Sequence, residues 1–219
     1  MRSPFTKQSV VMVGAPWCEG QNLEGADLAP WAMREAGIGE AVRSLGLAWD
    51  DHGDVDFRSI APANHPLREH HYSVDLYREW MAAATPYNFA KWMQERSRTP
   101  RTSKQRKRPH EAALGGAAVE AVNVVNAELM GGGLKLVHEA VRSTLTGEGP
   151  PPFVLSVGGD HSIASATISA MIGRYPSLGV VWIDAHADAN TPRSSPSGHY
   201  HGSVSTYPAP SRARPHTAR

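Results

Sequence analysis

A strand–helix–strand pattern over residues 153–183 constrains the fold of this chain more than any other feature of its sequence. Two short runs, Phe153–Val157 and Val180–Ile183, are mostly apolar, contain β-branched side chains and are bounded by glycine or proline. Such runs are typical of buried parallel strands. Between them, Ser162 is a candidate helix N-cap, apolar positions recur near the helical period, and Pro176 marks the end of the helix. The pattern predicts a βαβ crossover in an α/β domain.

Polar side chains follow both predicted strands at the point where each strand ends. His161 follows the first strand, and the second is followed by Asp184, His186, Asp188 and Asn190. The latter alternate with a period of two, so an extended backbone would project all of them to one side. The carboxyl ends of neighbouring parallel strands meet at one edge of a sheet. The two carboxylates and two imidazoles are therefore candidate metal ligands, of a kind that suits Mn²⁺ better than Zn²⁺ or Cu²⁺, with Fe²⁺ or Co²⁺ as alternatives.

This ligand set also indicates a type of chemistry. A carboxylate shared between two cations would let them bridge one water molecule, and such sites lower the pKa of that water and deliver a nucleophile to an electrophilic carbon. The alternative interpretation is a set of solvated loop charges. The strands expected before His161 and before Asp184 favour the metal site, because strand ends are where the hypothesis needs these residues.

Four motifs in this region together resemble the arginases of the ureohydrolase superfamily. They are GGDHS (158–162), DAHAD (184–188), NTP (190–192) and SGHYHG (197–202). Residues 9–57, which include VMVGAPWCEG and HGDVDF, are similar to the opening strand, loop and first helix of an arginase. The resemblance is weak over 110–145 and absent over 58–109 and 203–219. It implies a three-layer α/β/α fold with a mainly parallel sheet.

The resemblance implies hydrolysis of L-arginine to L-ornithine and urea with two Mn²⁺ ions. In that scheme Asp184 bridges both ions, His161 and Asp188 complete one of them, and His186 completes the other. Asp188 and His201 are the catalytic residues that the resemblance implies. His201 matches the histidine of the family that shuttles a proton, and an imidazole pKa near neutral suits this role.

The substrate contacts are also carried over from the resemblance. Asn190, Ser197 and residue 199 would hold the amino-acid end of the substrate, with His186 as a further contact. Residue 199 is histidine here, where arginases have asparagine, and an imidazole can still donate a hydrogen bond to a carboxylate. The NTP motif and the SG-x-x-HG loop favour an arginase over agmatine- or guanidinobutyrate-type ureohydrolases.

The resemblance also predicts how the chain is organised along its length. We expect an arginase-like α/β domain over 1–202, in which 58–109 is an atypical insertion, disordered over 96–109, and a disordered basic tail over 203–219. The family continues through further strands that supply an Asp-x-Asp metal motif and a glutamate for the guanidinium, whereas this sequence contains no Asp or Glu after Asp188. We therefore expect an arginase that is incomplete at its C-terminus, with a weak second metal site and at most trace activity.

Local patterns predict the remaining elements. Near the N-terminus we expect a strand at Val10–Val13 with a turn at Gly14–Pro16, and then a helix at Asp27–Ala36, capped by Asp27 and stopped by Gly37. A short helix at Ala41–Leu45 and an edge strand at Leu47–Asp50 should follow. Later in the chain we expect helices at Glu111–Ala127 and Leu134–Leu145, interrupted by Gly131–Gly133. The triple glycine lacks the Lys-Ser/Thr of a phosphate loop. His52 and Asp54 are expected to be structural.

Other features leave alternatives open. The run 96–108 holds seven cations and no acid, which fits a solvated insertion loop or, less well, a nucleic-acid-binding segment. A metal site at His65, His70 and His71 lacks an acidic ligand and a fixed scaffold. A non-catalytic arginase isoform that acts as a metal-binding or regulatory subunit is a second function class.

Composition and charge limit the partners and the cellular compartment that we expect for this protein. The net charge of +1 implies no strongly charged partner, and the single Cys18 excludes an internal disulfide and fits a reducing compartment. No apolar run reaches the length of a membrane span, and the first residues do not form a convincing targeting peptide. We expect a cytoplasmic protein with a small-molecule substrate, which forms a homo-oligomer or pairs with an intact subunit, without membrane or nucleic-acid partners.

Overall fold

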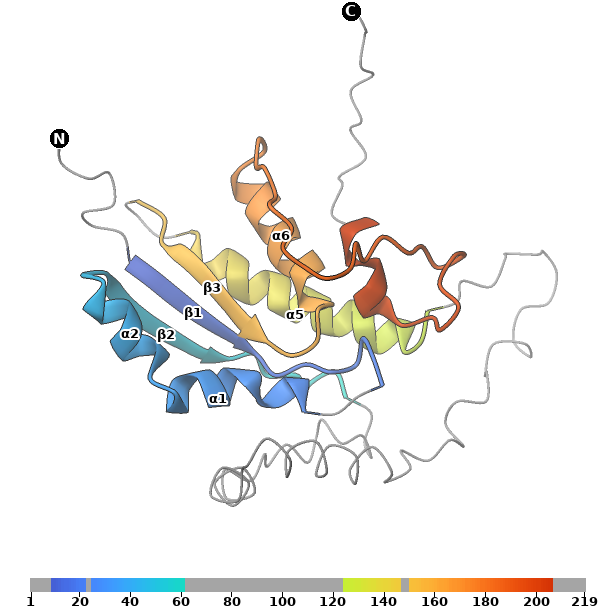
Figure 1. Ribbon diagram of the computed structural model, residues 1–219, viewed down its shortest axis with the longest axis horizontal. Coiled ribbons are helices and arrows are strands. Elements are labelled where there is room, and N and C mark those ends of the chain that lie inside the picture. Colours follow the sequence, from blue (N-terminus) through green and yellow to red (C-terminus); the bar gives the residue numbers. More distant parts are fainter. Residues whose placement is uncertain (1–8, 23–24, 62–123, 147–149, 207–219) are drawn as a thin grey trace, which may run out of the picture.

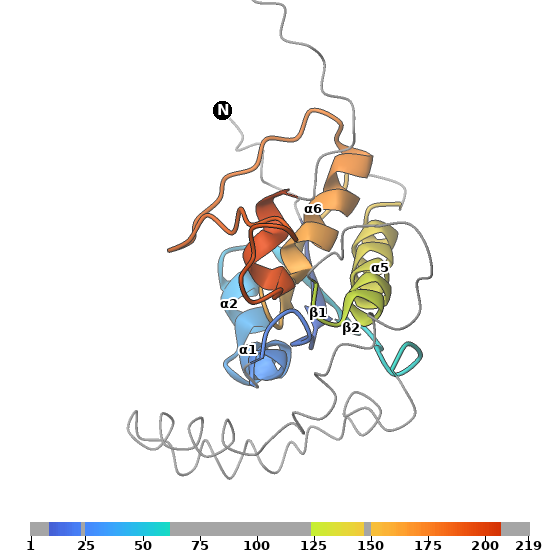
Figure 2. The same ribbon diagram turned by 90° about the vertical axis from the view of Figure 1, so that its right-hand side faces the viewer.

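The computed structural model defines residues 9–22, 25–61, 124–146 and 150–206. Its elements in chain order are β1 (Ser9–Ala15), the 3-10 helix η1 (Ala26–Leu28), α1 (Ala29–Glu35), α2 (Ile38–Ser44), β2 (Ala48–Asp54), α5 (Ala127–Thr144), β3 (Phe153–Gly158), α6 (Ile163–Arg174) and the 3-10 helix η5 (Tyr200–Thr206). The strands form one parallel sheet in the order β2–β1–β3. Helices α1 and α2 lie on one side of this sheet and α5 and α6 on the other (Figure 1, Figure 2). The predicted three-layer α/β/α fold is confirmed.

Strand β1 is the centre of the sheet because it is apolar on both of its faces. All its residues after Ser9 are buried, as expected for a strand with a sheet neighbour on each side and a helical layer on each face. Val10 pairs with Trp49 of β2 and with Phe153 of β3. Strand β2 is polar and largely exposed, which confirms the predicted edge strand.

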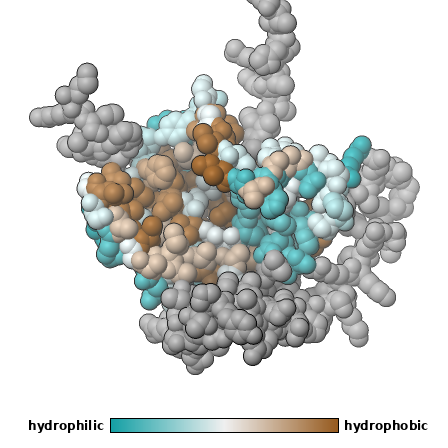
Figure 3. Space-filling view, in the orientation of Figure 1, coloured by the Kyte–Doolittle hydropathy of each residue, from teal (hydrophilic) through white to brown (hydrophobic). Residues whose placement is uncertain are grey.

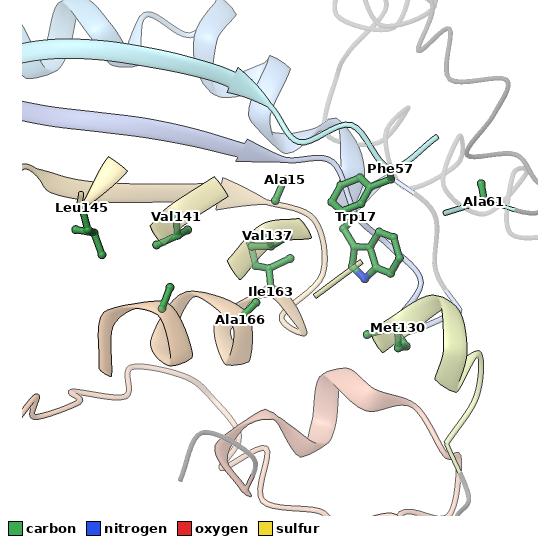
Figure 4. Packing of buried hydrophobic residues seen from close by; sticks show 11 residues of the cluster. Ala15, Trp17, Phe57, Ala61, Met130, Val137, Val141, Leu145, Ile163 and Ala166 are labelled. Carbon is green, nitrogen blue, oxygen red and sulfur yellow. The ribbon is translucent and has the colours of Figure 1, made fainter. Parts of the chain in front are cut away.

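The main hydrophobic core lies between the sheet and the α5–α6 layer (Figure 4). Trp17, which follows β1, is fully buried there, and its ring centroid lies 4.6 Å from that of Phe57. Helix α5 contributes Met130, Val137 and Val141 to this core, and α6 contributes apolar positions of its first turns. Burial of these side chains ties both helices to the loop that leaves β1.

Helix α5 runs through the triple glycine that was predicted to interrupt it, so that prediction is wrong. An ideal Cβ on Gly133 would lie 2.3 Å from the Trp17 ring, so only glycine lets the helix approach Trp17 this closely. The packing offsets the intrinsic cost of glycine in a helix, about 1 kcal/mol per residue. The helix begins at Ala127, after Asn126 in the left-handed conformation, and residues 111–123 lie outside the described residues.

The run Val180–Ile183 is not a strand, which contradicts the sequence prediction. Val181 and Ile183 are 87% and 94% exposed. A strand needs a hydrogen-bonding neighbour, and among the described residues β3 pairs only with β1. On the face in Figure 3, hydrophobic residues gather over the strands and α6, and hydrophilic residues gather over the segment that follows Ile183.

Two helix boundaries differ from those predicted. Asp27 does not cap α1, which begins at Ala29 with Leu28 as its N-cap. Instead the Asp27 carboxylate accepts hydrogen bonds from the Gly25 amide and from the buried Cys18 thiol. Helix α2 begins three residues before the predicted Ala41.

Among the described residues, no helix combines the length and the apolar character that a membrane crossing requires.

The prediction of a disordered tail from residue 203 onward is wrong for residues 203–206. These residues end the helix η5, and Ser203 and Val204 are buried. The hydroxyl groups of Ser205 and Thr206 donate hydrogen bonds to the carbonyls of Asp188 and Asn190. Contacts between such distant residues cannot be predicted from composition. Residues 207–219 lie outside the described residues, as do 62–123 with the basic run and the three clustered histidines.

Arg34 joins α1 to the edge strand through two carboxylates. Its guanidinium lies 2.7 and 2.9 Å from the two Asp51 oxygens and 2.7 Å from Asp54 Oδ1. Hydrogen bonding from Arg34 lowers the pKa of Asp51 below its ordinary value. Asp54 is thus engaged in a structural ion pair, and His52 lies 3.2 Å from Asp50.

Replacing Arg34 with methionine should lower the free energy of unfolding by about 1 kcal/mol at pH 7, since the bidentate pair is partly exposed. The folded-state pKa of Asp51 is depressed, so its contribution is present above the unfolded pKa of about 3.9 and is lost as pH falls through the folded value. Urea titrations at pH 7 and below pH 4 should therefore show a difference that shrinks in acid. Arg58→Met, whose partner Asp56 is only two residues away, is the control and should change little. A constant difference at both pH values would contradict the assignment.

Candidate metal centre

Three of the four predicted ligands converge at the carboxyl end of β3. His161 Nδ1 lies 2.6 Å from Asp188 Oδ2 and 3.2 Å from Asp184 Oδ2. One ligand atom from each of the three residues lies within 4.8 Å of the others. His161 follows the strand directly, and the two aspartates come from the segment after α6. Contacts in the folded chain thus bring together side chains that are up to 27 residues apart in the sequence.

Asp188 is held in place by its backbone. Its φ of 45° lies in the left-handed region, which costs a non-glycine residue about 1–2 kcal/mol. Its carbonyl accepts hydrogen bonds from both the amide and the hydroxyl of Ser205, at 3.1 and 2.9 Å. Two residues later, the Asn190 amide donates to the Gly202 carbonyl at 3.1 Å. Residues of η5 therefore stabilise the turn that points Asp188 at His161.

His186 stands apart from the three ligands, so the predicted projection of all four side chains to one side is wrong. The His186 amide donates to Asp184 Oδ1 at 2.7 Å, which turns the backbone where an extended strand was expected. This bond lowers the pKa of Asp184. The His186 side chain is 80% exposed, and its Nδ1 lies 3.5 Å from Asp184 Oδ1.

Trp182 is a supporting residue that the sequence did not single out. Its ring centroid lies 4.8 Å from that of His161, and its Nε1 donates to the His186 carbonyl at 3.3 Å. It thereby fixes the imidazole of one predicted ligand and the backbone of another. The signal that could have found it is its place two residues before Asp184, where the DAHAD motif begins.

His201 bonds to the loop after β1. Its amide and its Nδ1 both contact the Gly20 carbonyl, at 3.1 and 2.9 Å. The His199 ring lies 5.9 Å from the His201 ring, and the His199 amide donates to Ser197 Oγ. The Val125 amide donates to the Gly198 carbonyl, which joins the same loop to the residues before α5. The predicted substrate residues of the SGHYHG loop therefore lie between two other loops.

Asp160 was also missed, because the sequence directed attention to the histidine that follows it. Its side chain is buried, with only 6% of the residue exposed. Its carboxylate accepts the amide hydrogens of Gly20 and Ser162 at 2.7 and 2.9 Å. Burial raises the pKa of this carboxyl group, and hydrogen bonding from Ser162 and from the Gly20 amide opposes that rise. Asp160 thus joins the β1 loop to the start of α6.

The donor set fits a hard divalent cation. Two carboxylates and one imidazole present their ligand atoms within a small volume, and oxygen-rich sets with imidazole suit Mn²⁺ and similar ions. Asp188 is the least exposed of the three side chains, at 11%. Among the described residues, no second group of three such side chains is found.

Comparison with known proteins shows which proteins this chain is similar to. The chain is 32% identical over 194 residues to “Arginase-2, mitochondrial” of Oryctolagus cuniculus and 32% identical over 196 residues to “Arginase-1” of Xenopus laevis. These alignments cover 89% and 90% of this chain but 39% and 44% of the relatives, so the chain spans less than half of their length.

Solved structures give the same result. The arginase of Bacillus caldovelox is 26% identical, with a TM-score of 0.56, over 90% of this chain and 47% of that one. The sequence model described as “Arginase family” matches residues 8–216, which is nearly the whole chain. The protein therefore belongs to the arginase family.

Proposed function

We propose that this chain provides the metal-binding part of an arginase-type hydrolase that converts L-arginine to L-ornithine and urea with Mn²⁺. The observation that carries the proposal is the group of His161, Asp184 and Asp188 at the carboxyl end of β3, in a chain that belongs to this family. When bound, the cations would lower the pKa of a water molecule and so supply the nucleophile for the guanidinium carbon. His161 and Asp188 would hold one ion, and Asp184 would be shared with a second.

The proton transfers would fall to His201. Its Nδ1 contacts the Gly20 carbonyl, which leaves Nε2 as the atom that can accept and donate a proton during the reaction. An imidazole is suited to this role because its pKa lies near neutrality. The attacking water loses a proton and the departing amine gains one, and His201 Nε2 would carry the proton from the first to the second.

The amino-acid end of the substrate would be held by the polar loop after the ligands. Asn190, Ser197 and His199 offer amide, hydroxyl and imidazole groups that match a carboxylate and an ammonium group. His186, exposed beside Asp184, is available as a further contact or as a ligand of the second ion. The imidazole at 199 is the feature most able to change the choice of guanidino substrate.

The 219 residues contain few ligands for two cations. They hold no Asp or Glu after Asp188, and the converged group has two carboxylates. Ligand number and charge set the affinity of hard cations. We therefore expect this chain alone, with excess Mn²⁺, to release urea from arginine at no more than a trace rate. A non-catalytic metal-binding or regulatory subunit remains the second candidate, and the same shortage of carboxylates favours it.

A chimera tests the proposal. The segment of the Xenopus laevis arginase-1 that follows the position aligned with Thr206 is joined after Thr206, which keeps the contacts of Ser205 and Thr206 with the ligand segment. Urea release is then measured with Mn²⁺ and arginine, agmatine or guanidinobutyrate. We expect activity with arginine that is abolished by His161→Ala or Asp184→Ala. Robust urea release by the unmodified chain would contradict the ligand argument. A chimera that binds Mn²⁺ and ignores arginine would contradict the substrate and point to His199.

A further inference from the structure

We propose that Asp160 is a positioning residue for His201, acting through Gly20, and that it thereby holds the His201 imidazole in the tautomer protonated on Nδ1. This inference deepens the proposed function, since it concerns the proton-transfer group of the same site. It rests on a chain of contacts between three segments: the loop after β1, the loop after β3, and the SGHYHG loop.

Gly20 is the link between the two side chains. Its amide donates to Asp160 Oδ2 at 2.7 Å, the short distance that is typical of a charge-assisted hydrogen bond. Its carbonyl contacts both the amide and the Nδ1 of His201. The same residue therefore receives its position from Asp160 on one side and sets the position of His201 on the other.

Gly20 has no room to move toward Asp160. An ideal Cβ on this residue would lie 2.7 Å from Asp160 Oδ1 and 2.8 Å from Ser162 Cβ. The Asp160 amide in turn donates to the Trp17 carbonyl at 2.7 Å, so the two loops are bonded in both directions. Since Asp160 is buried, water does not compete for its carboxylate, and the Gly20 backbone is held in one place.

A fixed carbonyl selects the tautomer of the imidazole facing it. A carbonyl oxygen only accepts hydrogen bonds, so His201 Nδ1 must carry a proton to bond to Gly20. Neutral His201 then has its lone pair on Nε2, which is the state that can accept a proton. If Gly20 were displaced, the hydrogen bond from His201 Nδ1 to the Gly20 carbonyl would be lost. The ratio of the Nδ1–H tautomer to the Nε2–H tautomer would then fall about tenfold, which corresponds to the free energy of one hydrogen bond.

Asp160→Asn is the direct test, because it keeps the shape of the side chain and removes one acceptor oxygen. Each Asp160 oxygen accepts one amide hydrogen, from Gly20 or from Ser162, and an asparagine can accept only one of them. In the full 219-residue chain without metal, ¹⁵N-labelled histidine NMR should show His201 mainly as the Nδ1–H tautomer. In the variant that preference should fall about tenfold, and the Gly20 amide proton should move upfield.

Asp27→Asn is the matched control. Asp27 is another buried aspartate that accepts an amide hydrogen in the same region, from Gly25, and its loss should leave the His201 tautomer unchanged. A His201 signal that is Nε2–H in the unmodified chain would overturn the proposal. So would a folded Asp160→Asn chain with an unchanged tautomer ratio. If the variant does not fold, the unmodified chain decides, because a Gly20 amide proton without a downfield shift would also overturn it.

These signals require neither Mn²⁺ nor arginine, so failure of this proposal is distinguishable from failure of the proposed function. In a urea-producing chimera, Asp160→Asn should lower kcat and leave KM unchanged, because it displaces a proton-transfer group and no substrate contact. A change confined to KM would indicate a role in binding and would contradict the proposal.

Discussion

Asp188→Ala is expected to weaken Mn²⁺ binding by more than about 100-fold, because loss of a ligand should cost more than loss of an outer partner, which costs 10–100-fold. Asp188 is the least exposed of the three proposed ligands, and its Oδ2 lies 2.6 Å from His161 Nδ1. Its backbone is held by Ser205. Among the described residues, the group contains no carboxylate besides Asp184 that could replace it. Calorimetric titration of the 219-residue chain with Mn²⁺, with metal analysis of the dialysed protein, measures the effect.

His186→Ala provides the informative comparison. The sequence makes His186 a ligand equal to the others, whereas the structure leaves its side chain exposed and outside the converged group. We therefore expect it to cost about tenfold in Mn²⁺ affinity or less, as for a supporting residue. Asp56→Ala, an exposed aspartate paired with Arg58, is the control for the loss of one carboxylate and should leave binding unchanged. Equal losses at His186 and Asp188 would contradict the three-ligand arrangement.

The sequence predicted those parts of the fold that local patterns determine. Strand β1 and strand β3 are apolar runs that end at glycine-containing loops, and α6 has its periodic face and a proline beyond its end. The end of β3 was predicted, and with it the place of His161, whereas the second strand of the predicted βαβ crossover, 180–183, is not formed. The arginase resemblance was carried by the loops at these ends, and the comparisons confirm the family.

The wrong predictions share a physical cause, which is that long-range contacts overrode local propensity. Three glycines should break a helix, but Gly133 allows α5 to pack against Trp17. The run 180–183 has the composition of a strand, but a strand also needs a neighbour, and composition carries no information about one. Residues 203–206 lack apolar periodicity, yet their hydrogen bonds to the ligand loop order them.

The predictions of the site were limited in the same way, because they gave the residue types and not the directions of the side chains. The ligand types were read from the sequence, and three of them converge. Their directions were not readable, because the turn at Asp184 and the left-handed backbone at Asp188 depend on hydrogen bonds that form only in the folded chain. Asp160 was missed for a related reason, since its partner Gly20 lies 140 residues away.

Gly159→Ala is expected to destabilise the chain by more than about 3 kcal/mol, at or beyond the upper end of ordinary overpacking, because the clash is with backbone. An ideal Cβ on Gly159 would lie 1.7 Å from the Trp17 carbonyl oxygen and 2.6 Å from its carbonyl carbon. No side-chain rotation can relieve this contact, so the loops after β1 and β3 would have to separate. The separation would break the hydrogen bonds from the Gly159 amide to Ala15 and from the Asp160 amide to Trp17.

The matched control is the same substitution where there is space. Gly131 lies in α5 with nothing within 4 Å of its ideal Cβ, so Gly131→Ala should raise the free energy of unfolding by about 0.5–1 kcal/mol through helix propensity. Urea denaturation followed by the fluorescence of Trp17 and the other tryptophans measures both variants. Against a typical domain stability of about 5–15 kcal/mol, this loss should move the unfolding transition of Gly159→Ala to a clearly lower urea concentration. If it instead unfolded at the urea concentration of the unmodified chain, the two loops could not cross as closely as described, and the placement of Asp160 and His161 beside Trp17 would be wrong.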